Sequence, residues 1–178
     1  MKIVKMLFCC FLLALPFSLR AQSGSEPSAS DSVRKFVQGF YDWYVPLALT
    51  SGSGPAWNMA LKVKGNCFSP ELGRKLREDS DAQAKAEGEI VGLDFDPFLN
   101  SQDPGRHYRV DKVVPKGGSY FVEIHRVSAG KSEEKITATA EVMGKNGQWY
   151  FVNFLYPNGP NLLGVLKALK DDRDKPNP

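Results

Sequence analysis

The spacing of apolar residues changes near the middle of the chain, and this change constrains the fold most. Before it, apolar side chains recur every three or four residues, which predicts helices with one buried face. After it, apolar and polar side chains alternate, which predicts strands over residues 107–114, 120–127, 135–143 and 148–156. The three separators are short and rich in turn residues, so neighbouring strands must run antiparallel. A four-stranded meander is therefore expected.

The strongest helical pattern covers residues 31–49. Its apolar face carries the side chains Val33, Phe36, Val37, Phe40, Tyr41 and Tyr44. Ser30 or Asp31 is expected to cap its start by accepting backbone N–H bonds. Pro46 is expected to end it, because a proline disfavours helical backbone at the residue before it.

Further helical signals lie on both sides of the predicted sheet. Residues 56–61 predict a short helical turn, and Ser69-Pro70-Glu71 predicts the start of a helix that runs to about residue 86. Residues 161–170 predict a last amphipathic helix, followed by a frayed polar end. The expected fold class is α+β, with N-terminal helices packed on a curved, cone-like four-stranded antiparallel sheet. One domain spans residues 31–157, and residues 158–178 form the short C-terminal helix and tail.

The first 21 residues have the pattern of a secretory signal peptide. Lys2 and Lys5 precede an apolar run from Met6 to Leu19, and Ala21 offers a small residue before a cleavage site. This run is shorter than the roughly 20 residues that span a bilayer, although a retained anchor is the alternative. Residues 22–30 are rich in serine and predict a flexible linker. We therefore expect a periplasmic or secreted protein, with no membrane span after cleavage.

Charge and cysteine content narrow the possible partners. The chain has 23 basic and 20 acidic side chains, and three of the basic ones lie in the acid-free leader, so the remainder is formally neutral. A nucleic-acid partner is not expected, because phosphate binding requires a basic surplus or stripe. Two of the three cysteines also lie in the leader. Cys67 is then expected to be a small buried residue, with an intermolecular disulfide as the alternative.

Two segments resemble a known bacterial family. Phe68-Ser-Pro-Glu-Leu72 and Val91-Gly-Leu-Asp-Phe-Asp-Pro-Phe-Leu-Asn-Ser-Gln-Asp103 are similar to the domain-of-unknown-function 3828 family. The helices-first order and the last strand, residues 147–154, resemble the wider nuclear-transport-factor-2-like (cystatin-like) superfamily. The resemblance covers roughly residues 31–157. It implies an exported bacterial protein with a cone-shaped α+β fold, whose open end binds a small molecule, holds an active site or is filled. It implies no catalytic residues.

An acidic segment lies between the predicted helices and strands. Its oxygen donors are Asp94, Asp96, Asn100 and Asp103. Calcium prefers such ligands, but the segment lacks the central glycine and terminal glutamate of a calcium loop. The favoured interpretation is that Phe95, Phe98 and Leu99 fill the open edge of the core, while the carboxylates accept loop N–H bonds. No metal or other cofactor is expected.

A second candidate for chemistry is histidine. His125 lies within a predicted strand, where Asp111 or Glu123 is a possible acid–base partner. The favoured alternative is a solvated sheet face with cross-strand charge pairs. Motifs of zinc sites, serine hydrolases and phosphate loops do not occur in this sequence.

These patterns favour an exported, non-enzymatic binding domain. Its partner would be a protein, with an immunity-like role as one form, or a small ligand, held at the cone mouth or on the sheet face. Candidate binding residues are Tyr44, Trp57, Arg109, His125 and Trp149. The alternative is a small cone-pocket enzyme that uses His125 with Asp111 or Glu123.

Overall fold

The computed structural model describes residues 28–50, 52, 54–157 and 159–175. The predicted signal peptide, and the predicted linker up to residue 27, lie outside these residues. Within the described ranges, no helix combines the length and apolar character that a membrane span requires.

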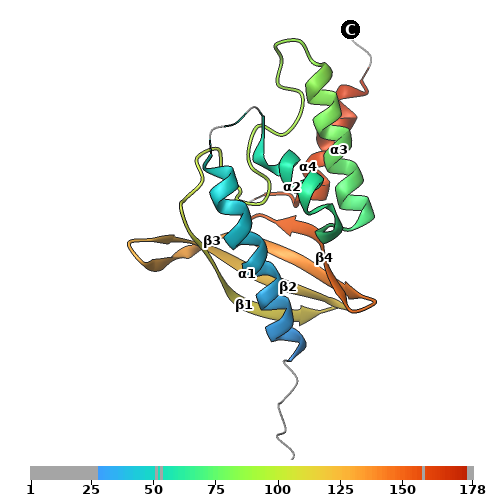
Figure 1. Cartoon of the computed structure of the whole chain (residues 1–178). Helices are drawn as coiled ribbons and strands as arrows, with labels where there is room; N and C mark the ends of the chain where they lie inside the picture. Colours follow the sequence, from blue (N-terminus) through green and yellow to red (C-terminus); the bar gives the residue numbers. More distant parts are fainter. Residues whose placement is uncertain (1–27, 51, 53, 158, 176–178) are drawn as a thin grey trace, which may run out of the picture.

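The chain forms four α-helices, one short 3₁₀ helix and one sheet (Figure 1). In order, the elements are α1 (Ala29–Ala48), α2 (Ala56–Val63), η1 (Gly65–Cys67), α3 (Pro70–Lys85), β1 (Tyr108–Lys116), β2 (Ser119–Ser128), β3 (Lys131–Lys145), β4 (Gln148–Leu155) and α4 (Leu162–Arg173). The strands pair antiparallel in the order β1-β2-β3-β4, and the sheet is open. This confirms the predicted α+β class and the meander. The last helix runs three residues beyond its predicted end.

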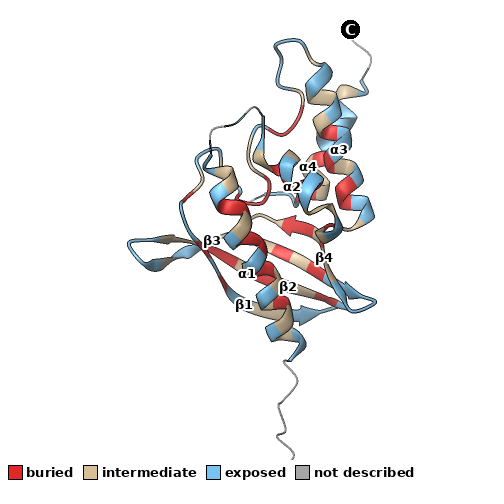
Figure 2. Cartoon of the chain, viewed as in Figure 1, coloured by how far each residue is buried: buried red, intermediate tan, exposed pale blue. Residues whose placement is uncertain are grey.

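Helix α1 lies across one face of the sheet, and its buried side faces the strands (Figures 1 and 2). It begins two residues earlier than predicted. The residue that caps it is Ser28, whose Oγ accepts the Asp31 N–H at 3.1 Å, in place of the predicted Ser30 or Asp31. The prediction failed because three neighbouring serine and aspartate residues are all competent caps, so that packing of the apolar face decides among them.

The prediction that Pro46 ends α1 is wrong. The helix continues to Ala48, and the N–H of Leu49 still donates to the Val45 carbonyl at 3.1 Å. Pro46 lies in the last turn, so its missing N–H removes one helical bond only. The Thr50 hydroxyl then donates to the Pro46 carbonyl at 2.8 Å and satisfies one of the terminal acceptors.

The segment from α2 to α3 covers the β4 edge of the sheet. Phe68 forms a parallel bridge with Phe151, and the N–H of Ser69 donates to the Phe151 carbonyl at 2.8 Å. Ser69 also caps α3 as predicted, by accepting the Leu72 N–H at 3.2 Å. Helix α3 packs beside α4 and meets the sheet at β4 (Figure 1). Of the N-terminal helices, α1 is therefore the one that covers the sheet face.

The opposite edge is protected by side chains of α1. Gln38 accepts the Val110 N–H at 2.9 Å and donates to the Tyr108 carbonyl at 3.1 Å, as a neighbouring strand would. Arg34 donates to the carbonyls of Val110, at 3.2 Å, and Asp111. Unpaired backbone groups on an edge strand invite aggregation, so these two side chains block β-pairing along this part of β1.

Each hairpin turns through two residues in the left-handed region. The pairs are Gly117-Gly118, Ala129-Gly130 and Asn146-Gly147, with φ between 48° and 83°. Two positive φ values define the turn that matches the twist of antiparallel strands. The predicted Asn146-Gly147 hairpin is confirmed. Ala129 is the exception among the six, because it has a Cβ but lacks the short polar side chain that lets asparagine tolerate the left-handed conformation.

Replacing Ala129 by asparagine is therefore expected to raise the free energy of unfolding by about 1 kcal/mol. Asparagine tolerates this conformation, and the β3–β4 turn already uses it at the equivalent position. The matched control is Asn146→Ala, for which we expect a loss of similar size. Urea denaturation followed by circular dichroism measures both. Changes of the same sign in the two variants would contradict the backbone explanation.

The core is dominated by contacts between aromatic rings. Phe40 is at its centre, and the rings around it belong to Tyr44, Phe68, Phe98 and Phe151. These rings come from α1, from β4, from the link between η1 and α3 (Phe68) and from the segment between α3 and β1 (Phe98). The core thus joins the helical layer to the sheet, and it also holds the segment between α3 and β1.

Candidate functional site

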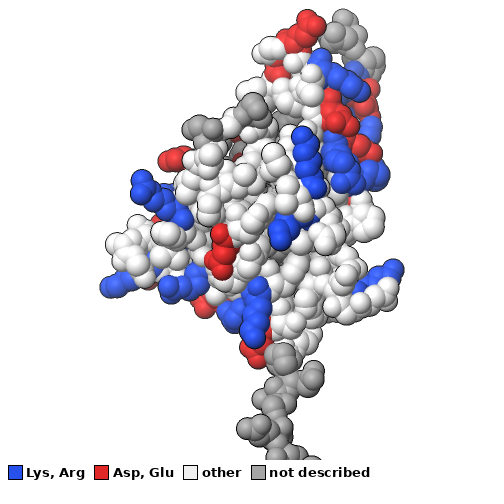
Figure 3. Space-filling view, in the orientation of Figure 1, with Lys and Arg blue, Asp and Glu red and all other residues white. Residues whose placement is uncertain are grey.

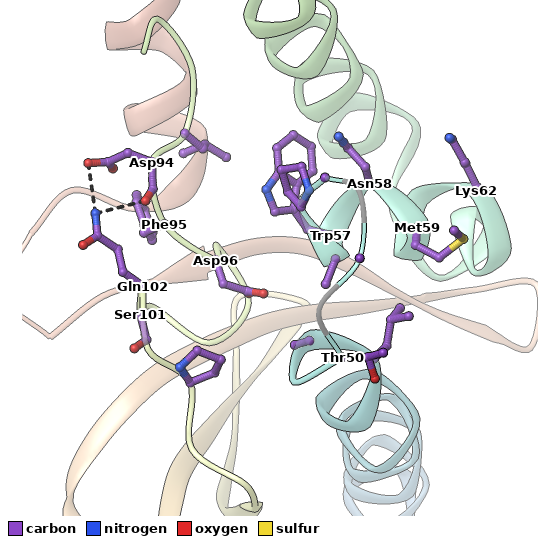
Figure 4. A pocket seen from close by; sticks show the side chains of 18 residues that line it. Thr50, Trp57, Asn58, Met59, Lys62, Asp94, Phe95, Asp96, Ser101 and Gln102 are labelled. Atoms are coloured by element: carbon purple, nitrogen blue, oxygen red, sulfur yellow. Dashed lines mark hydrogen bonds between the residues drawn. The ribbon is translucent and has the colours of Figure 1, made fainter. Parts of the chain in front are cut away.

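A cleft of about 750 Å³ opens between the end of α1, the start of α2 and the segment of residues 93–104 (Figure 4). One wall is formed by Leu47, Trp57 and Met59, which are apolar. The facing wall carries Asp96 and Gln102, which are polar. Trp57 is buried in its wall, whereas Met59 is 44% exposed at the rim. The cleft therefore offers a ligand both apolar contact and hydrogen bonds.

Two buried tyrosines of α1 and a third after β4 hold the polar wall in place. The hydroxyl of Tyr41 donates to the Phe98 carbonyl at 2.7 Å, and that of Tyr156 donates to the Pro97 carbonyl at 2.9 Å. Tyr44 donates to Asp96 Oδ2. Hydrogen bonds from three well-packed side chains fix this segment, so the cleft wall is preformed.

Asp96 is the centre of this wall. Its Oδ1 accepts the N–H groups of Phe98, at 2.9 Å, and Leu99, at 3.0 Å. Burial raises the pKa of this carboxyl above its ordinary value, although the bonds from Tyr44 and the two N–H groups oppose the shift. Burial also raises the pKa of Tyr44, and the Asp96 charge adds to that effect. Of the three residues predicted to fill the core edge, Phe98 and Leu99 are fully buried, whereas Phe95 is only half-buried.

The other oxygen donors of this segment are used separately. Asp94 accepts Gln102 Nε2 through its backbone oxygen at 3.0 Å and through Oδ2 at 3.3 Å. Asn100 donates to the Thr137 carbonyl at 3.0 Å, and Asp103 is exposed. Within the described residues, no three His, Cys, Asp or Glu side chains gather as metal ligands. The calcium alternative thus finds no support in this geometry.

His125 is 6% exposed, so it does not belong to a solvated sheet face. Its Nδ1 donates to the Glu133 carbonyl at 2.8 Å, and its Nε2 is buried without a partner among the described residues. The pairing of β2 with β3 is irregular on both sides of His125. His125 and Val127 are two residues apart on β2, yet their partners Ile136 and Ser132 are four residues apart on β3.

The acid–base alternative receives no support from this arrangement. Among the described residues, no hydrogen bond joins His125 to Asp111 or Glu123. None of these three residues lines the 750 Å³ cleft. The imidazole bonds to a backbone carbonyl of β3 where the pairing of β2 with β3 is irregular.

The five predicted binding residues lie in three places. Trp57 lines the cleft, and Tyr44 is fully buried behind its polar wall, where it bonds to Asp96. The exposed Arg109 is paired with His125 across β1 and β2. Trp149 makes structural contacts away from both places. Its indole N–H donates to Ser32 Oγ at 3.0 Å, and its ring covers Gly144, where an added Cβ would approach within 2.7 Å.

Cys67, the last residue of η1, is half-buried and packs against the core, so the predicted burial is met only in part. Burial raises the pKa of its thiol, which disfavours the reactive thiolate. Its position at the end of a three-residue helix keeps one side of it open to solvent.

Sequence reasoning did not select Thr50, Met59 or Gln102, which line the cleft. They are an exposed loop residue, a rim residue of a short helix and a loop amide, and none carries a signal in the sequence. Comparisons with protein-family models, with curated proteins and with solved structures find no match for this chain.

Proposed function

We propose that this chain is an exported binding domain that holds a small organic ligand in the cleft between α1, α2 and residues 93–104. The observation that carries this proposal is the cleft itself. Its volume of about 750 Å³ lies within the range of small-molecule sites, roughly 300–1,000 Å³. Its mixed walls and its fixed polar side are typical of such sites.

We also propose membership of the domain-of-unknown-function 3828 family, within the nuclear-transport-factor-2-like superfamily. Helices followed by a four-stranded meander support this assignment. The cleft would then correspond to the open end of the cone. The signal-like leader supports export to the periplasm or beyond.

The cleft favours the small-ligand form of the binding hypothesis over the protein-partner form. A concave site encloses most of a small molecule, whereas a stable protein interface needs about 800 Å² on each partner. An immunity-like partner would dock on the outer sheet face, which is the face opposite α1. Such docking would leave the fixed cleft wall without a role.

A neutral probe tests whether the cleft binds. We expect 2-phenylethanol at millimolar concentration to shift the amide signals of Trp57, Met59 and Gln102 in a ¹⁵N-labelled sample. Thr50→Trp should abolish these shifts, because Thr50 is an exposed residue that lines the cleft. The control Ser128→Trp adds the same side chain at a distant, exposed hairpin and should leave them unchanged.

The opposite pattern would overturn the proposal. Shifts confined to the outer sheet face, for example at Phe121 and Glu123, would place the binding surface on the sheet. Shifts that persist fully in Thr50→Trp would show that the cleft is not the site.

A further inference from the structure

We infer that the cleft selects a cationic ligand, an organic ammonium ion with a short apolar body, and that Asp96 is its charge partner. This inference rests on the proposed function and names the ligand class of the same site. Three features of the cleft support it: the sign and position of its charges, the free acceptor of Asp96 and the apolar wall opposite.

The charges that line the cleft are unevenly placed. Asp94 and Asp96 both belong to the 93–104 wall, and Lys62 is the single cation among the described lining residues. Lys62 is exposed on α2, and Figure 4 shows it at the far rim, beyond Met59 from Asp96. Other charged side chains, of both signs, gather over α3 and α4 (Figure 3). The interior of the cleft therefore has a negative wall.

Asp96 retains one unused acceptor position. A carboxylate oxygen accepts about two hydrogen bonds, and the two N–H groups fill Oδ1. Oδ2 accepts from Tyr44 alone, and Figure 4 shows the carboxylate directed into the cleft. Burial deprives the ionised group of water, as its raised pKa indicates. A ligand ammonium would supply both a donor and the opposite charge.

The facing wall fits the apolar part of such a ligand. Met59 offers an exposed thioether, which is polarisable and adapts to different shapes. Leu47 and Trp57 continue this wall towards the end of α1. In a ligand with a short spacer between the ammonium and an aromatic ring, the ammonium would face Asp96 and the ring would face the apolar wall.

Three probes of similar shape and different charge test the inference. They are 2-phenylethylammonium, 2-phenylethanol and 3-phenylpropanoate, each titrated into the ¹⁵N-labelled protein. We expect the ammonium to bind at least tenfold more tightly than the alcohol, and the propanoate most weakly. Asp96→Asn should bring the affinity for the ammonium within about twofold of that for the alcohol. Asparagine can still accept the two N–H bonds at this position.

Asp94→Asn is the matched control, because Asp94 is exposed and lies outside the Tyr44 contact. It should weaken the ammonium by less than threefold. If Asp96→Asn does not fold, two variants at exposed positions test the inference. Lys62→Met should raise the affinity for the ammonium, and Asp94→Asn should lower it. Changes of the opposite signs would overturn the inference.

The remaining outcomes separate the two proposals. Equal binding of ammonium and alcohol at the cleft would overturn the charge inference and leave the proposed function standing. Preference for the propanoate, lost in Lys62→Met, would also overturn it and would assign the cleft to anions. If none of the three probes shifts the cleft amides, the inference and the proposed function fail together.

Discussion

Replacement of Asp79 by alanine is expected to lower the free energy of unfolding by about 3–5 kcal/mol. Asp79 is 1% exposed, and its Oδ1 accepts Arg173 Nη1 at 2.7 Å. Its Oδ2 accepts the Leu93 N–H at 2.9 Å, while Arg173 also donates to the Val91 carbonyl at 2.7 Å. The variant would remove the carboxylate from a largely buried guanidinium and from a buried N–H. Urea denaturation followed by circular dichroism measures the loss.

The exposed pair of Arg74 and Glu78 on the same helix is the control. Arg74 Nη1 lies 2.5 Å from Glu78 Oε1, but both side chains are about half exposed. Exposed pairs of this kind contribute about 0–1 kcal/mol, so Glu78→Ala should have little effect. The double variant Asp79→Ala/Arg173→Ala should lose less stability than the sum of the losses of the two single variants. Equal losses for Asp79→Ala and Glu78→Ala would contradict the role given to burial.

This ion pair also explains why the end of α4 was predicted too early. Residues 171–173 are polar, and a polar run at a chain end is typical of fraying. The side chain that extends the helix is Arg173, and its partner is 94 residues earlier in the sequence. No local pattern indicates a contact of that kind.

Local signals, by contrast, predicted the sheet well. Alternation and turn composition are properties of neighbouring residues, so the four strands and the Asn146-Gly147 turn were recognisable. The cap at Ser69 was predicted for the same reason. The bulges were not, because they depend on how two strands slide past each other. His125, which was predicted on a solvated face, lies where the pairing is irregular in this way.

The cleft was only partly predictable. Aromatic content identified Tyr44 and Trp57, and the acidic segment identified Asp96. The cleft itself is formed by three segments that are far apart in the chain, and its size depends on how α1, α2 and residues 93–104 pack. Residues such as Met59 and Gln102 come to line the cleft through this packing alone.

The segment that forms the polar wall is also expected to be a main support of the core, and Phe98 tests this. We expect Phe98→Ala to lower the free energy of unfolding by about 3–5 kcal/mol. The ring is fully buried although it lies outside any helix or strand. Its centroid lies 5.1–5.5 Å from those of Phe40, Tyr44, Phe68 and Phe154. Alanine would leave a cavity bounded by four rings that cannot all move inward.

Phe95→Ala is the control for this prediction, because it removes the same side chain three residues earlier. Phe95 is half-buried, and its one aromatic neighbour within the described part of the chain is Tyr156, with ring centroids 5.7 Å apart. Partial burial limits the expected loss to about 1–2 kcal/mol. The measurement is again urea denaturation, with added calcium in a parallel series. Similar losses for the two variants, or recovery of Phe98→Ala by calcium, would show that residues 93–104 act as a surface or ion-binding loop. The expected difference instead follows from a segment that fills the core with Phe98 and presents Asp96 to the cleft.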